Sequence, residues 1–203
     1  MRGRGLLLGA FLALAAPSAA AQNLRVTILT PPLAVPPFAL ADAHGRPRSR
    51  AMLRGHWSLL YMGFTHCPDL CPMTLANLVD IVGRMKKIPG APVPAIIFLA
   101  VDPKRDKPLL AEYLAHYGAG ILGITGPQKA VDALAAGLGG FVVLESPDQK
   151  GDYDVAHSSE ISIIDPKARV RARLTPPMPA AETAHYLARL FAGSGPAAES
   201  RAR

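Results

Sequence analysis

Cysteine is scarce in this chain of 203 residues, which holds only Cys67 and Cys71. A single pair excludes the multi-disulfide scaffold on which small exported domains depend. The chain is long enough to bury a hydrophobic core as one domain without such cross-links. A bridge within this pair would close a very short loop, and the stabilisation from a cross-link grows with loop length in the chain-entropy account. The pair is therefore better suited to reactivity than to a structural role.

Clustered positive charge is also missing, although the formal net charge is +7. The basic residues are scattered or lie within 45–54 and at the last three positions, and no aromatic side chains alternate with them. A nucleic-acid-binding surface would show a concentrated basic patch, so we expect no nucleic-acid partner. The mild positive charge is compatible with solubility or with docking to an acidic partner. The sequence also contains no internal repeat.

An N-terminal hydrophobic run follows two arginines and covers 5–16, and small residues come directly after it. This order is typical of a secretory signal peptide. Ala19 and Ala21 satisfy the A-x-A cleavage pattern, so residues 1–21 are the predicted signal peptide. Retention as a membrane anchor is the alternative, but the run is shorter than the ~20 residues that span a bilayer. We therefore expect an exported protein, periplasmic or membrane-associated and facing the periplasm.

The rest of the chain divides into three predicted parts. Residues 22–37 contain four prolines, which forbid a continuous helix and favour extended or edge structure, so we interpret them as a lead-in arm. Residues 38–192 form the predicted folded domain, which opens with a small hairpin around a turn at 42–45. Residues 193–203 are polar and glycine-rich, and they predict a flexible tail.

Hydrophobic periodicity in the predicted domain alternates between strand and helix spacing. Predicted strands cover 57–64, 95–101, 121–124, 141–144, 161–164 and 170–174, and predicted helices begin near Pro72, Pro108, Pro127 and Pro179. The last two strands flank a turn at 165–168, which indicates an antiparallel hairpin. This order predicts an α/β fold with a mixed sheet flanked by helices on both faces and an added hairpin.

The two cysteines lie where the first core strand ends and its helix begins. A helix N-terminus presents free N–H groups and a positive dipole end, so we expect it to stabilise thiolates there. Thiolate is the form required for both disulfide exchange and metal binding. A cysteine pair at this junction is the thioredoxin-like arrangement, although the spacing here is C-x-x-x-C rather than C-x-x-C. The pattern leaves open whether Cys67 and Cys71 form a redox-active disulfide or bind a soft metal.

A third ligand would make a metal site workable, and the chain has six histidines. The four in the loop-rich early region or on predicted helices are His44, His56, His116 and His185. Each is more simply a surface or core side chain. His66 adjoins Cys67, but adjacent side chains of an extended segment point to opposite faces. His157 lies between a polar loop and a strand that could fold over the cysteines, and a hydrogen-bonded structural histidine is the alternative.

Three motifs in order closely resemble the SCO/SenC family of copper-binding proteins. They are G-F-T-H-C-P-D-L-C-P over 63–72, V-D-P-K-R-D over 101–106 and H-S-S over 157–159. The resemblance covers about 35–192 and implies a thioredoxin-like fold. It also implies that Cys67, Cys71 and His157 bind copper, as Cu(I) or Cu(II).

The same resemblance implies a function in the assembly of cytochrome c oxidase. The chain would be a copper chaperone rather than an enzyme, and its partner would be the copper-bearing oxidase subunit, a recipient close to the membrane. Another copper carrier or a thiol reductant would be a further partner. The alternative is a thiol-disulfide oxidoreductase that keeps the copper-ligand cysteines of the oxidase reduced. A thiol peroxidase is a third reading, but no arginine or threonine spacing around Cys67 supports it.

One position departs from the family pattern. An acidic residue often precedes the family's histidine, whereas this chain has Ala156 there and Asp154 two places earlier. The change puts the copper affinity or the preferred oxidation state in question. Asp102 and Asp106 match the family's D-P-x-R-D segment, but helix capping and a turn are the simpler account of Asp106 and Pro103, and neither aspartate is expected to be a ligand.

Overall fold

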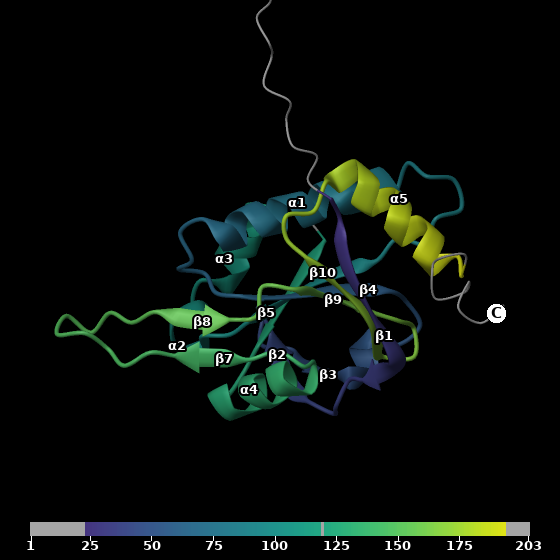
Figure 1. Cartoon of the computed structure of the whole chain (residues 1–203). Helices are drawn as coiled ribbons and strands as arrows, with labels where there is room; N and C mark the ends of the chain where they lie inside the picture. Colours follow the sequence, from purple (N-terminus) through teal and green to yellow (C-terminus); the bar gives the residue numbers. More distant parts are fainter. Residues whose placement is uncertain (1–22, 119, 194–203) are drawn as a thin grey trace, which may run out of the picture.

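A computed structural model describes residues 23–118 and 120–193 of the chain (Figure 1). The predicted signal peptide and residues 194–203 of the predicted tail lie outside these ranges. Within them, no helix combines the length and the apolar character that a membrane crossing needs.

Across the described ranges, eight strands form one mixed sheet in the order β1-β10-β9-β4-β5-β6-β2-β3. They are β1 (Arg25–Ala34), β2 (Ala39–Asp42), β3 (Pro47–Ser49), β4 (Ser58–Gly63), β5 (Ala95–Ala100), β6 (Ile121–Thr125), β9 (Ile161–Ile164) and β10 (Arg169–Thr175). The central strands β4, β5 and β6 run parallel, and the remaining pairs are antiparallel. Every residue of β4 is buried, as expected for a central strand covered on both faces. The predicted mixed sheet is confirmed.

The proline-rich segment lies at the edge of this sheet. It forms β1, which pairs with β10, and the register shifts between Ile28 and Leu33 around Pro31 and Pro32. Proline lacks the N–H that a ladder requires, so it is tolerated at an edge or an irregular point. The prediction of extended edge structure is confirmed, and the segment belongs to the main sheet. The predicted β2–β3 and β9–β10 hairpins are also found.

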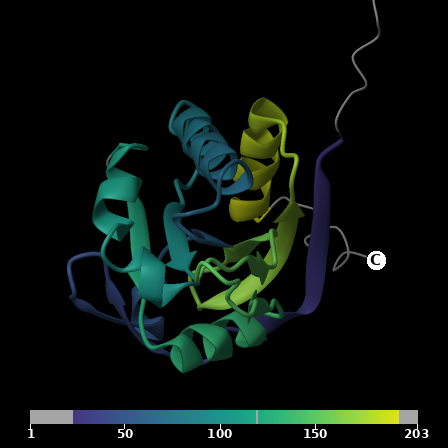
Figure 2. The same cartoon turned by 90° about the vertical axis from the view of Figure 1, so that its left-hand side faces the viewer.

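Helices cover both faces of the sheet, as predicted (Figure 2). One face packs against α1 (Leu70–Met85), α3 (Leu110–Ala115) and α5 (Ala180–Phe191). The other packs against α4 (Gln128–Gly137) and the short 3-10 helix η1 (Arg50–Leu53). The helix expected to begin near Pro108 starts at Leu110, after the single turn α2 (Pro103–Asp106).

The single tryptophan of the chain packs α5 against the sheet. Trp57 comes directly before β4 and stacks on Phe191, with ring centroids 4.2 Å apart and planes 12° apart. Such aromatic pairs contribute about 0.5–1.5 kcal/mol beyond the burial of their area. Asn77 of α1 donates a hydrogen bond to the carbonyl of Met178, just before α5, at 2.8 Å. The two helices therefore share one side of the core.

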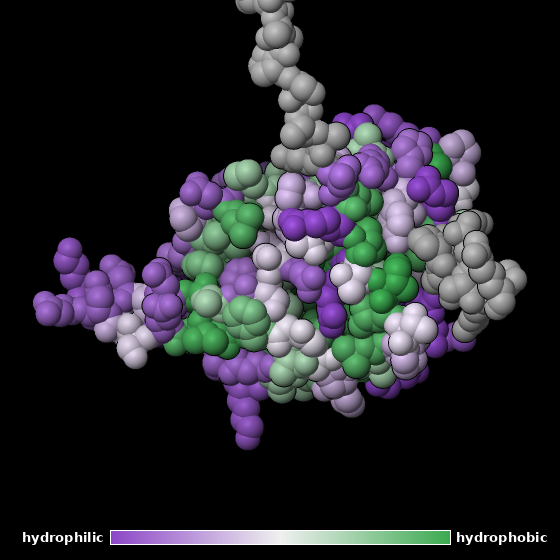
Figure 3. Space-filling model, in the orientation of Figure 1, coloured by the Kyte–Doolittle hydropathy of each residue, from purple (hydrophilic) through white to green (hydrophobic). Residues whose placement is uncertain are grey.

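A two-stranded ribbon stands apart from the main sheet. It consists of β7 (Val142–Leu144) and β8 (Val155–His157), which pair antiparallel with each other (Figure 1). The strand predicted at 141–144 is therefore found, but outside the main sheet. Its outward side is apolar near the base, where Phe141 and Val143 are 54% and 52% exposed, whereas the ribbon tip is hydrophilic (Figure 3).

Candidate metal centre

The cysteines lie at the junction of β4 and α1, as predicted. Cys71 is in the first turn of α1 and is fully buried, whereas Cys67 precedes the helix and is half-buried. The backbone N–H of Cys71 donates to Cys67 Sγ at 3.3 Å. Both residues are free thiols. The turn thus brings the two sulfur-bearing residues together, with one accessible and one enclosed.

Gly63 allows the close approach of Cys71 to the central strand. A Cβ atom at position 63 would lie 3.1 Å from Cys71 Sγ and 2.7 Å from Cε2 of Phe98. Ordinary contacts between carbon atoms are about 3.5–4.0 Å. The absence of a side chain at this position therefore makes room for the buried sulfur above β4.

His157 ends β8 with its ring directed at Cys71. Its Nε2 lies 3.9 Å from Cys71 Sγ, and its Nδ1 lies 3.0 Å from the carbonyl oxygen of Ser158. A carbonyl can only accept, so Nδ1 carries a proton, and in the neutral imidazole the lone pair of Nε2 faces the sulfur. Metal bonds of about 2.3 Å to sulfur and 2.1 Å to nitrogen place two such ligand atoms about 3.6 Å apart at a tetrahedral angle and about 4.4 Å apart when collinear. The observed separation falls between these limits.

Aromatic rings enclose the approach of His157 to Cys71. The imidazole meets the rings of Phe64 and Tyr61 edge-on, with centroids 5.9 Å and 6.4 Å away. The hydroxyl of Tyr61 donates to Cys71 Sγ at 3.4 Å. These contacts fix the ring and keep the buried sulfur in apolar surroundings.

Burial decides the protonation of Cys71. Desolvation raises the pKa of its thiol to about 12, and the hydrogen bond from Tyr61 lowers it by less. The expectation that the start of α1 stabilises a thiolate is therefore wrong for this residue, because loss of solvation outweighs the helix terminus. At neutral pH Cys71 therefore carries its proton, and it must release that proton to bind a metal.

The second motif holds the cysteine loop in place. The buried carboxylate of Asp106 accepts hydrogen bonds from the N–H and the hydroxyl of Thr65, at 2.7 Å and 2.8 Å. It also accepts from the backbone N–H of Asp102 at 2.9 Å. Burial raises the pKa of Asp106, although these bonds favour its ionised form. Asp106 thus does more than cap the start of α2, because it also binds Thr65 in the segment before Cys67.

The same motif contacts the chain that leads into β8. Asp102 is fully buried, and both of its carboxylate oxygens accept from the hydroxyl of Tyr153 at 3.0 Å. Arg105 forms an ion pair with Asp102, and its guanidinium carbon lies 3.9 Å from the centroid of the Tyr153 ring. Partial burial, then the bond to Asp102, raises the pKa of Tyr153, so the phenol keeps the proton it donates. The sequence analysis did not predict these contacts. The only signal for them was that Asp102 and Arg105 belong to the second family motif.

The predicted ligands lie near one another without forming a closed metal cluster. Within the described residues, no group of three or more His, Cys, Asp or Glu side chains is arranged to hold a metal ion. The structure nevertheless brings Cys67, Cys71 and His157 to one place. His66 is exposed, and its Nδ1 lies 3.1 Å from the hydroxyl of Thr65.

Ala156 faces away from the cysteines. It is exposed, pairs with Val143, and neighbours His157 on a strand whose side chains alternate in direction. An acidic side chain at this position would therefore project to the opposite side of the ribbon from the imidazole. Asp154 is likewise exposed.

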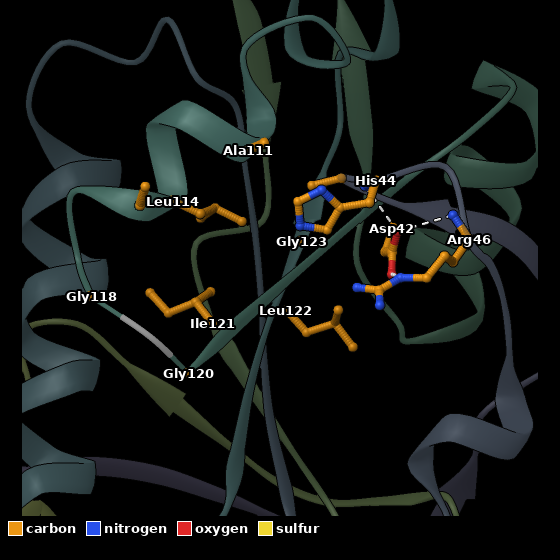
Figure 4. A pocket seen from close by; sticks show the side chains of 12 residues that line it. Asp42, His44, Arg46, Ala111, Leu114, Gly118, Gly120, Ile121, Leu122 and Gly123 are labelled. Carbon is orange, nitrogen blue, oxygen red and sulfur yellow. Dashed lines mark hydrogen bonds and ion pairs between the residues drawn. The ribbon is translucent and has the colours of Figure 1, made fainter.

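A separate pocket lies between α3, β6 and the turn after β2 (Figure 4). Its volume is about 320 Å³, and its polar lining includes Asp42, His44 and Arg46. Asp42 accepts hydrogen bonds from Arg46 and Arg48, at 2.8 Å and 2.7 Å, so its charge is already compensated. The lining includes neither cysteine nor His157, which separates this pocket from the candidate metal centre.

The arrangement defines a class of protein. A parallel β4-β5-β6 core, helices on both faces and a cysteine pair at the end of β4 characterise a thioredoxin-like fold. The family model for SCO1/SenC matches residues 27–192. The chain belongs to the SCO1/SenC family.

Solved structures and curated proteins agree with this assignment. Copper-bound Sco1 from yeast aligns with a TM-score of 0.74 and 28% identity, covering 85% of this chain and 95% of that one. The human mitochondrial SCO2 homolog is 38% identical over 130 residues, which is 64% of this chain and 49% of that protein. This chain thus matches about half the length of the human relative. A third structure is that of BsSco, a member of the Sco family of cytochrome c oxidase assembly proteins in which a disulfide switch was identified. It aligns with a TM-score of 0.61 and 24% identity, covering 79% of this chain and 95% of that one. At this identity the match supports the fold alone.

Proposed function

We propose that this protein binds copper through Cys67, Cys71 and His157 and delivers it to the copper-bearing subunit of cytochrome c oxidase during assembly. The observation that carries the proposal is the position of the His157 ring, whose Nε2 faces Cys71 Sγ at 3.9 Å while its Nδ1 lies 3.0 Å from the carbonyl oxygen of Ser158. Family membership and the copper bound by the yeast relative support the choice of metal. The oxidase as recipient follows from the family resemblance.

The ligand set suits copper as a cargo. Two sulfur ligands and one imidazole accommodate both Cu(I) and Cu(II), because thiolate is soft and imidazole binds either state. The neutral imidazole of His157 offers the lone pair of Nε2, whereas Cys71 must give up its proton. Cys67 is the more accessible sulfur and is placed to exchange with ligands of a recipient. Transfer would then proceed by replacement of one ligand at a time.

Copper titration of the reduced protein tests the ligand set. Absorption spectra should show a thiolate-to-Cu(II) charge-transfer band that shifts or weakens in His157→Ala and in Cys71→Ser, and that is absent when Cys67 and Cys71 are both replaced by serine. His66→Ala is the matched control, since it removes a nearby imidazole and should leave the band unchanged. Copper affinity and spectrum equal to the parent in His157→Ala would overturn the assignment of this residue.

The thiol-disulfide oxidoreductase remains the second candidate, favoured by one observation. One thiol is half-buried and the other fully buried, which provides an attacking and a resolving sulfur. Cys67 and Cys71 would become a disulfide while a partner disulfide is reduced to two thiols. This function requires both cysteines and not His157. A His157→Ala protein that reduces the partner and restores oxidase assembly would favour it over copper delivery.

We also propose that the protein acts outside the cytoplasm, facing the periplasm near its membrane-bound recipient. The N-terminal pattern of residues 1–21 supports this location. A further copper carrier or a thiol reductant would supply the metal or the electrons. Cell fractionation with a protease-protection assay tests the location, and a protein found only in the cytosolic fraction would contradict it.

A further inference from the structure

We propose that the segment around α2 positions His157 against the cysteine loop, through a contact with Tyr153. We call Asp102, Arg105 and Asp106 the α2 bridge. The inference rests on the proposed function, because it concerns the geometry of a proposed copper ligand. Tyr153 and Arg105 are positioning residues in this proposal and do not touch the metal.

One side of the α2 bridge is fixed to the cysteine loop. Asp106 receives two hydrogen bonds from Thr65, which lies two residues before Cys67. Its third bond, from the N–H of Asp102, joins the two aspartates of the bridge. Buried, charge-assisted hydrogen bonds therefore fix the position of the α2 bridge relative to the cysteine loop.

The other side holds the ribbon that carries His157. In the described part of the chain, β7 and β8 pair only with each other, so backbone bonding to the main sheet does not set the ribbon's orientation. Tyr153 lies four residues before His157, and its hydroxyl bonds both carboxylate oxygens of Asp102. This contact joins the approach to β8 with the buried charge of the bridge.

Arg105 completes the contact from the bridge to the imidazole. Its guanidinium carbon lies 3.9 Å from the Tyr153 ring centroid and 5.8 Å from that of Phe64, whose ring meets His157 edge-on. One of its nitrogens, Nη2, is buried and has no hydrogen-bond partner among the described residues. A buried donor without a partner is costly, so the ion pair with Asp102 and the contacts with the two rings have to offset that cost. The position of Arg105 thus couples the ribbon to the shell around His157.

A variant lacking one hydroxyl separates positioning from general stability. Tyr153→Phe removes the bond to Asp102 and keeps the ring over Arg105. Tyr186→Phe is the matched control, because the Tyr186 hydroxyl on α5 is buried and makes no hydrogen bond within the described ranges. We expect Tyr153→Phe to weaken copper binding about 10-fold, the usual scale for an outer contact of a metal ligand, and Tyr186→Phe to leave it unchanged. Chelator competition on the reduced full-length protein gives the affinities.

The same substitution in a His157→Ala background is the decisive measurement. If the bridge acts through His157, Tyr153→Phe has no additional effect once the imidazole is gone. The same 10-fold loss in both backgrounds would instead show an effect on the cysteines or on the fold, and would overturn the inference. An unchanged affinity for Tyr153→Phe in the wild-type background would also overturn it.

A copper-free measurement separates this inference from the proposed function. In nuclear magnetic resonance spectra of the reduced protein, the contact between the Phe64 and His157 rings should weaken in Tyr153→Phe and persist in Tyr186→Phe. Its persistence in Tyr153→Phe would refute positioning even if copper binding is established. Conversely, parental copper affinity in His157→Ala would refute the ligand assignment, while the ring contact still decides whether the bridge orients the imidazole.

Discussion

Replacing Gly63 with alanine should destabilise the protein from the centre of its sheet. The new methyl group would lie 2.7 Å from Phe98 Cε2 and 3.1 Å from Cys71 Sγ, and both side chains are fully buried. Overpacking of this kind costs about 1–3 kcal/mol. The lower backbone entropy of alanine in the unfolded chain returns about 0.5–1 kcal/mol. From the middle of each range, the net loss in the free energy of unfolding should therefore be about 1 kcal/mol.

Urea unfolding of the copper-free, reduced protein measures this loss. With a slope of about 2 kcal/mol/M, the midpoint should fall by roughly 0.5 M. Gly83→Ala is the matched control, because a Cβ there meets nothing within 4 Å inside α1. It should raise the free energy of unfolding by about 0.5–1 kcal/mol through helix propensity. Equal stabilisation by both substitutions would refute the argument that Gly63 makes room for Cys71.

Three further predictions concern the core, a buried charge and the metal site. Phe191→Ala should lower the free energy of unfolding by about 3–5 kcal/mol, because it removes a mostly buried ring and its stack on Trp57; an unchanged urea midpoint would contradict this. Burial alone would raise the pKa of Asp42, but hydrogen bonds, led by that from Arg48, outweigh burial and hold the pKa below its usual value. The stabilisation from Asp42 is therefore present above the unfolded pKa of about 3.9 and is lost as pH falls through the folded pKa. In an acid denaturation series, the difference in the free energy of unfolding between the parent and Asp42→Asn should narrow below about pH 4. Copper binding near pH 7 should release the proton of Cys71, so affinity should rise with pH, and titration calorimetry in buffers of different ionisation enthalpy should detect that proton.

Hydrophobic periodicity was sufficient to predict most of the fold. The buried run of β4, the helical spacing of α1 and the turn between β9 and β10 are local patterns, and each element appears where its pattern lies. The placement of 141–144 was not local, because a strand of three residues carries no information about its partner. Its pairing with β8 depends on contacts across a polar loop.

The sequence predicted which residues form the candidate site, but not the side-chain contacts that hold them in place. The motifs identify Cys67, Cys71 and His157, which the fold brings together although Cys71 and His157 are 86 positions apart. The bonds of Asp106 to Thr65 and of Asp102 to Tyr153 span 41 and 51 positions. No periodic pattern encodes side-chain contacts of this kind, so a cap and a turn were the simplest local account of Asp106 and Pro103.

The protonation of Cys71 shows a second limit of sequence reasoning. The start of a helix is visible in the sequence, and its dipole favours a thiolate. Burial depends on everything that packs around the residue, including Tyr61 and Gly63, and here it dominates. The sign of a pKa shift therefore depended on the tertiary structure rather than on the helix terminus.

Trp57 gives the protein a built-in optical probe. The indole lies at the start of β4, and six strand residues of about 3.3 Å each place it roughly 20 Å from the cysteine loop. Because Trp57 is the sole tryptophan and stacks on Phe191, its fluorescence reports the attachment of α5 without direct contact with the ligands. A change in its emission spectrum on copper addition would thus reveal a structural response transmitted along the length of the sheet.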